Sequence, residues 1–171
     1  VYRLGGLALP DEAGDLDAAR ACGAVALFSE RLRAADRHFV LDAGTLLLAA
    51  GTYTGPATVD RPMVVDGGGK AHIDGQQRES VLRVRANSAT IRGLILTGSG
   101  DSHDRVDSAI VVEGHYNRIE DNRIEDVLFG ITLHASNHNV VARNFIRSRP
   151  VDLADRGDGL RLWYSTGNRI E

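Results

Sequence analysis

The sequence has 171 residues, of which 43% are hydrophobic and 25% are charged, and its formal net charge is −3. This length suits one globular domain, and the acidic balance argues against a nucleic-acid-binding protein, which usually shows a basic face. One cysteine excludes an internal disulfide and a zinc site built from several cysteines. No run approaches the roughly 18 apolar residues of a membrane span, so we expect no membrane insertion, and no signal peptide is visible.

The composition of residues 15–39, rich in alanine, leucine, glutamate and arginine, favours a helix. Val25, Phe28, Leu32 and Ala35 are spaced three, four and three residues apart, which predicts one apolar face of an amphipathic helix. An open end of a stacked β-structure exposes strand edges that invite pairing with other chains. We therefore expect residues 1–40 to be a helical N-terminal cap region that covers such an end.

From residue 41 onward the helical pattern stops and the sequence repeats. The tetrapeptide Asn-Arg-Ile-Glu stands at 117–120 and again at 168–171. Alignment on this motif gives two ladders of apolar residues. At spacings of 32, 28, 22 and 29 residues, the first ladder comprises Val59, Ile91, Ile119, Val141 and Ile170. Five residues later in each repeat, the second comprises Val64, Leu96, Ile124 and Ile146.

Such spacings are typical of a solenoid, in which stacked repeats share one core. We therefore expect residues 41–171 to be all-β and to form the coils of a right-handed parallel β-helix, with a β-sandwich as the alternative. Because Glu171 falls inside a coil, we expect this β-helix to be truncated at the C-terminus. Recurring asparagines are expected either to hydrogen-bond between coils or to act as turn residues: Asn117, Asn139 and Asn168, and also Asn122 and Asn144.

Four segments carry a family resemblance. Residues 44–53, 98–107, 117–130 and 156–165 read GTLLLAAGTY, GSGDSHDRVD, NRIEDNRIEDVLFG and RGDGLRLWYS. With these segments, residues 44–171 resemble the NosD family of periplasmic β-helix proteins that mature nitrous oxide reductase. The chain departs from the family at Ser108 and Ala109, where Ala-Gly is expected.

The resemblance implies a non-enzymatic accessory protein in the periplasm that assists copper-site assembly. Its implied partners are the subunits of an ABC transporter and nitrous oxide reductase or a copper chaperone. No bound cofactor is assigned, because Cu(I) prefers thiolate and thioether ligands and the chain has one cysteine and one methionine. Copper itself remains open, with His103 as the candidate metal ligand.

Two polar loops carry the candidate partner- or ligand-binding residues. The first loop contributes Asp101, His103, Asp104, Arg105 and Asp107, and the second, with the strand after it, contributes Asp155, Asp158, Arg161, Trp163 and Tyr164. Both loops are expected to leave the same corner of the coil, with one short coil between them, so they would stand about 9.6 Å apart. Strand alternation predicts that one of the two neighbouring rings, Trp163 or Tyr164, points inward.

Four interpretations of these loops stay open: solvated surface, a docking face for a partner protein, a metal site and a pair of catalytic carboxylates. The last would make the chain a carbohydrate-active lyase, hydrolase or epimerase, with Asp101 or Asp104 facing Asp155 or Asp158. Carbohydrate grooves usually present several aromatic platforms, and only 5% of the residues are aromatic. We therefore predict no enzyme and no catalytic residue, with the carbohydrate-active enzyme second and a purely structural β-helix module third.

Overall fold

The computed structural model describes residues 41–42 and 44–171, and of these residues 44–171 form one compact unit. The predicted capping helix and the rest of residues 1–40 lie outside the described residues. Among the described residues, no helical segment has the length and hydropathy needed to cross a bilayer.

The described chain is all-β, as predicted, apart from the short 3-10 helix η1 (Leu153–Asp155). The strands are β1 (Leu41–Asp42), β2 (Thr45–Leu47), β3 (Gly51–Thr54), β4 (Ala57–Val59), β5 (Val64–Asp74), β6 (Leu82–Val84), β7 (Thr90–Thr97), β8 (Ser108–Val112), β9 (Arg118–Glu120), β10 (Arg123–Val127), β11 (Phe129–His134), β12 (Val140–Ala142), β13 (Phe145–Ser148), β14 (Leu160–Trp163) and β15 (Arg169–Ile170). These short β-strands are rich in valine, isoleucine, leucine and threonine, which suit a pleated and half-buried surface.

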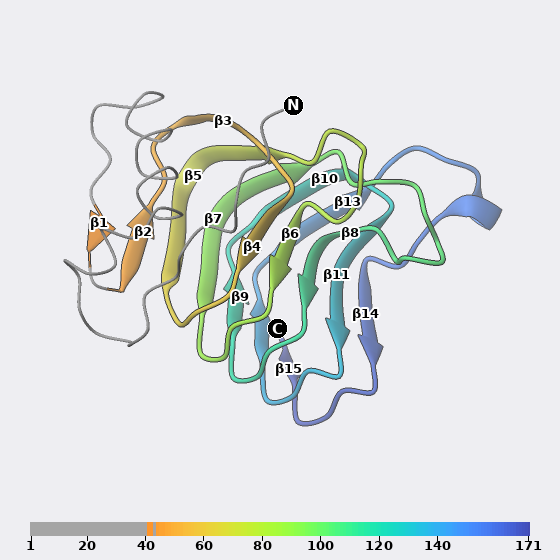
Figure 1. Cartoon of the computed structure of the whole chain (residues 1–171). Coiled ribbons are helices and arrows are strands. Elements are labelled where there is room, and N and C mark those ends of the chain that lie inside the picture. The colour runs from red at the N-terminus through yellow and green to blue at the C-terminus, as the bar shows by residue number, and fades with distance from the viewer. Residues whose placement is uncertain (1–40, 43) are drawn as a thin grey trace, which may run out of the picture. The chain divides into compact units, whose positions relative to one another are not determined.

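Within residues 44–171 the strands form two sheets of parallel strands (Figure 1). The first sheet runs β2-β5-β7-β9-β12-β15, with β3 beside β5, β10 beside β7, and β13 beside β10. The second sheet runs β4-β6-β8-β11-β14. Each strand therefore pairs with its counterpart in the next repeat, an arrangement compatible with the predicted solenoid.

The first predicted ladder is confirmed from its second member onward: the register pairs Ile91 with Ile119, then Val141 and Ile170. The prediction of Val59 as its first member is wrong. Val65, not Val59, pairs with Ile91, whereas Val59 lies in the second sheet opposite Val84.

The second ladder shows the same kind of error. Leu96, Ile124 and Ile146 pair as predicted, but their first neighbour is Ile73, and Val64 pairs with Thr90. The cause is an insertion in β5, where residues 67–70 stand opposite the single residue 93 and shift the register. Because this bulge separates the two core positions of β5 by eight residues instead of five, the regular spacing fails there.

The recurring asparagines connect successive repeats. Oδ1 of Asn117 accepts a hydrogen bond from the backbone N–H of Ala89 at 2.7 Å. Oδ1 of Asn139 accepts one from the N–H of Asn117 at 2.8 Å, and Oδ1 of Asn168 accepts one from Asn139 at 2.8 Å. A second row is formed in the same way by Asn122 and Asn144. The predicted bonds between repeats are therefore confirmed, and they satisfy buried backbone donors.

Apolar side chains of both sheets form the core. The largest fully buried ones are Leu82, Ile91, Leu94, Leu96, Ile110, Ile119, Ile124, Ile131 and Leu133. Since alternate residues of a strand point to opposite faces, the residues between these core positions point outward. On the second sheet, some of these outward residues form one side of the candidate site.

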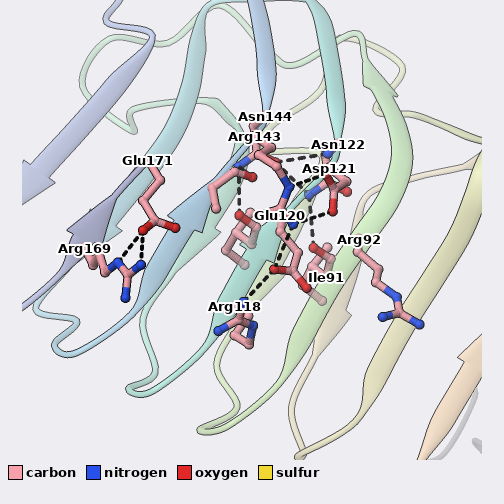
Figure 2. A network of polar contacts seen from close by, with 12 residues as sticks. Ile91, Arg92, Arg118, Glu120, Asp121, Asn122, Arg143, Asn144, Arg169 and Glu171 are labelled. Carbon is pink, nitrogen blue, oxygen red and sulfur yellow. Dashed lines mark hydrogen bonds and ion pairs between the residues drawn. The ribbon is translucent and has the colours of Figure 1, made fainter.

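An ion-pair network lies on the outer face of the first sheet (Figure 2). The guanidinium of Arg143 lies 3.4 Å from the carboxylate of Glu120 and 2.7 Å from that of Asp121. Arg123 likewise binds Glu125 at 2.9 Å. Hydrogen bonds from these arginines lower the pKa of Asp121 and the pKa of Glu125. The network thus couples neighbouring repeats through charge as well as through the backbone.

Candidate functional site

The two polar loops leave the same corner of the fold, as predicted. Between them in the chain, β10 and β11 are joined by a short connection at Leu128. The backbone N–H of Phe129, the first residue of β11, donates to the carbonyl of Asp107 at 3.3 Å. The N–H of Gly130 donates to the carbonyl of Asp158 at 3.0 Å. The C-terminal ends of three connections therefore stack in successive repeats: the first loop, the short connection between β10 and β11, and the second loop.

The first loop is organised by the buried carboxylate of Asp107, whose side chain is 2% exposed. This carboxylate accepts hydrogen bonds from the backbone N–H of Ser102 at 3.0 Å and from Nη2 of Arg105 at 2.9 Å. A Cβ on Gly100 would lie 2.2 Å from the same carboxylate, so glycine is required there. The bond to Asp107 also raises the pKa of Arg105. Asp107 is therefore a structural residue of the loop.

Backbone strain is present next to this carboxylate. Val106 has a φ of 54°, a left-handed conformation that is rare for a β-branched residue and costs about 1 to 3 kcal/mol. The N–H of Val106 donates to the carbonyl of His103 at 3.1 Å, and Nη2 of Arg105 donates to the carbonyl of Arg78 at 3.3 Å. These bonds hold the loop in a fixed turn that leaves His103 and Asp104 exposed.

A groove of about 490 Å³ lies between this loop and the outer face of the second sheet. Its floor contains outward residues at the same register on three neighbouring strands: Val111 of β8, Thr132 of β11 and Arg161 of β14. Val111 is 6% exposed and Thr132 is 4% exposed although both point outward. We infer that the first loop covers this part of the sheet.

Arg83 of β6 pairs with Val111 and extends this row. In the next outward row His134 pairs with Trp163 in register, and both line the groove together with Glu113. Oε1 of Glu113 lies 2.5 Å from Arg83, and Oε2 lies 3.1 Å from Arg85. Sequence reasoning did not place Arg83, Val111, Glu113, Thr132 or His134 in this groove. Alternation within a strand marks which residues point outward, but the register between coils was needed to bring them together.

The groove gathers five of the predicted site residues: His103, Asp104, Arg105, Arg161 and Trp163. The other five are not among its lining residues. Asp107 is buried behind the loop, Asp155 ends η1, and Asp158 lies at the corner. Asp101 forms an ion pair with Arg149, and Tyr164 is 81% exposed.

Arg161 is held by aromatic rings. Its Cζ lies 4.6 Å from the ring centroid of Trp163 and 5.6 Å from that of Phe129. The rings of His103 and Phe129 meet edge to face, with centroids 5.6 Å apart. Within residues 44–171 no carboxylate lies within 4.0 Å of the Arg161 guanidinium, whereas Arg83 and Arg105 both have carboxylate partners. Arg161 is thus a positioned cation without a counterion in the described structure.

The prediction that one of Trp163 and Tyr164 points inward is wrong. Trp163 is 45% exposed and Tyr164 is 81% exposed. Tyr164 follows the end of β14 and has a φ of 51°, so strand alternation no longer applies to it. The two rings meet edge to face with centroids 5.7 Å apart. Both are therefore available on the surface beside the groove.

Metal ligation by His103 stays a prediction. In the described part of the chain, no group of three or more histidine, cysteine, aspartate or glutamate residues is placed to hold a metal ion.

Comparison with known proteins adds a family likeness to this geometry. Over 135 residues the chain is 31% identical to the probable ABC transporter binding protein NosD of Pseudomonas aeruginosa, covering 74% of this chain and 32% of that protein. Over 126 residues it is 28% identical to the protein of the same name from Stutzerimonas stutzeri, covering 72% of this chain and 29% of that protein. The chain is similar to NosD. It spans about a third of the length of these curated relatives. No family model matches the chain, and no solved structure matches it.

Proposed function

We propose that the chain is a NosD-like accessory module without enzymatic activity, and that the surface around its groove docks a partner protein. The observation that carries this proposal is the exposed pair Trp163 and Tyr164 beside the unpaired Arg161. Tryptophan, tyrosine and arginine are the residues most enriched at binding hot spots. The likeness to NosD over about three quarters of the chain supports an accessory role.

We further propose that residues 44–171 are coils of a right-handed parallel β-helix. Support comes from the parallel pairing of each strand with its counterpart in the next repeat, and from the asparagine bonds between repeats. Such a scaffold holds side chains of successive coils at a fixed spacing of about 4.8 Å. It therefore presents a rigid face to a partner, which keeps the cost of ordering that face on binding low.

The cellular role that we propose is assistance in copper-site assembly of nitrous oxide reductase, in the periplasm and together with an ABC transporter. Because both relatives are named as probable ABC transporter binding proteins, transporter subunits are the first partners to test. Nitrous oxide reductase and a copper chaperone are the next candidates. In this proposal copper is a cargo of the assembly, and the chain acts as the scaffold.

A carbohydrate-active enzyme is the second candidate, favoured by a groove that contains Trp163 and the carboxylate of Asp104. Hydrolysis of a glycosidic bond needs two carboxylates that face that bond. The other groove carboxylate, Glu113, binds Arg83 and Arg85 through its two oxygens. Because these bonds compete with substrate chemistry, we rank this activity below docking. A purely structural module is the third candidate.

The docking proposal is tested by co-purification and by the copper content of nitrous oxide reductase. Trp163→Ala combined with Tyr164→Ala should abolish co-purification with transporter subunits and lower the copper content of nitrous oxide reductase. A second variant, His103→Ala with Asp104→Asn and Asp158→Asn, tests the loops. The matched control is Tyr116→Ala, an exposed ring that stacks on His138 and does not line the groove.

Normal co-purification and normal copper content in both groove-side variants would overturn the docking proposal. Turnover of a uronic-acid polymer that is lost in Asp104→Asn would instead promote the enzyme. A purely structural module would respond to neither test. Thermal unfolding of each variant is measured in parallel, so that loss of docking is not confused with loss of folding.

A further inference from the structure

The charges of the groove are unevenly paired. Three arginines line it, and two of them are neutralised by carboxylates: Arg83 by Glu113 and Arg105 by Asp107. Arg161 has aromatic neighbours only, within the described residues. A guanidinium stacked on rings keeps its N–H edges free to donate two parallel hydrogen bonds to a carboxylate. The groove therefore offers an anionic group one unpaired cation, the guanidinium of Arg161.

The surroundings of Arg161 favour an extended protein segment as the source of that anion. The groove is open and follows the outer face of the second sheet, and its volume of about 490 Å³ is enough for a few side chains. Trp163 is 45% exposed beside the guanidinium and offers an apolar platform for a neighbouring side chain. A single ring next to one unpaired arginine resembles a protein–protein hot spot more than a row of sugar platforms.

We propose that the groove binds an acidic segment of the partner protein, with a glutamate or aspartate side chain on Arg161 and an adjacent apolar side chain on Trp163. This inference rests on the proposed docking function and names the partner chemistry. Asp104 also lines the groove, and it forms no ion pair among the described residues. Its negative charge opposes an acidic ligand, so it limits the affinity and favours segments that place their carboxylate at Arg161.

The groove contains its own reporter, because Trp163 is the one tryptophan of the 171-residue chain. Its fluorescence is titrated with the blocked peptide acetyl-Ala-Glu-Leu-Glu-Ala-amide and with the glutamine version of the same peptide. Calorimetry on the same protein provides an independent affinity. Digalacturonate and succinate are titrated in parallel, to distinguish a peptide from a saccharide or a small carboxylate as the source of the anion.

We expect the acidic peptide to bind and the glutamine peptide to bind at least about tenfold more weakly, an effect that decreases with added salt. Arg161→Ala should weaken the acidic peptide about tenfold or more, and Arg161→Lys should weaken it less. Asp104→Asn should strengthen it, because a like charge is removed. The control Arg169→Ala removes an arginine that pairs with Glu171 on the first sheet and should leave the affinity unchanged.

Equal binding of the two peptides, or full binding in Arg161→Ala, would overturn the inference. Tighter binding of digalacturonate or succinate than of the acidic peptide would also overturn it. If no probe bound at millimolar concentration, the acidic-segment inference would fail, whereas the docking function would still be decided by co-purification of the Trp163 and Tyr164 variants. The two failures are therefore distinguishable.

Discussion

The carboxylate of Asp107 accepts hydrogen bonds from the guanidinium of Arg105, two residues before it in the loop that walls the groove. The Asp107 side chain is 2% exposed, whereas that of Arg105 is 64% exposed. Asp107→Ala should lower the free energy of unfolding by about 1.5 to 3 kcal/mol, because charged hydrogen bonds are lost and the N–H of Ser102 loses its acceptor. Urea denaturation measures the change. Asp104→Ala, an exposed change in the same loop, should stay within about 0.5 kcal/mol, and equal effects would contradict the structural role of Asp107.

Gly130 and Gly159 occupy equivalent places in successive repeats but have different surroundings. A Cβ on Gly130 would lie 2.1 Å from the carbonyl oxygen of Gly159 and 2.6 Å from Cγ2 of Ile146. A Cβ on Gly159 would meet Cγ2 of Ile146 at 3.8 Å, an ordinary contact. Gly130→Ala should therefore destabilise the protein by about 1 to 3 kcal/mol, and Gly159→Ala should be tolerated. Thermal and urea unfolding of this matched pair check the prediction, which fails if the order is reversed.

The asparagine rows should contribute through their buried members. Asn139→Ala removes the acceptor of the buried Asn117 N–H and should cost about 1 to 3 kcal/mol in the free energy of unfolding. Oδ1 of Asn87 accepts the same kind of bond from the N–H of His115 at 2.7 Å, but Asn87 is exposed. Because water can replace that bond, Asn87→Ala should cost less. Similar costs in urea denaturation would show that burial does not decide the contribution.

The ion-pair network on the first sheet should make stability depend on acid. Arg143 lowers the pKa of Asp121, and Arg123 lowers the pKa of Glu125, so both pKa values are lower in the folded state than in the unfolded state. The stabilisation is then present above the unfolded values of about 4 and is lost as the pH falls through the folded values.

Urea midpoints measured from pH 7 down to pH 2 test this dependence. Asp121→Asn combined with Glu125→Gln should reduce the loss of stability in acid. Salt should weaken the effect, chiefly at Asp121, whose side chain is exposed whereas that of Glu125 is half-buried. Asp60→Asn changes an exposed carboxyl that has no ion pair in the described structure and is the control. An unchanged pH profile in the double variant would contradict the assigned role of these arginines.

The sequence predicted the repeat well from Ile91 onward, where the two ladders keep a constant offset of five residues. It also predicted the asparagine bonds, because the same polar residue recurs at equivalent places and each repeat lies against the next. The first repeat was misaligned, since the bulge at residues 67–70 interrupts the pattern. Spacing alone does not reveal a local insertion that the core tolerates.

The polar loops were visible in the sequence as dense clusters of charge, and five of their predicted residues do line the groove. By itself the sequence thus determined the all-β repeat and the corner that bears its polar loops, because buried positions must recur in every repeat to fill one core. Tertiary structure alone decided that Val111, Thr132 and His134 complete the groove, that Asp107 is structural, and that Arg161 has no counterion among the described residues. Outward residues of different coils come together only through the register between strands. Which charges form ion pairs depends on the lengths of the loops and of the side chains, and the repeat pattern of the sequence does not specify these.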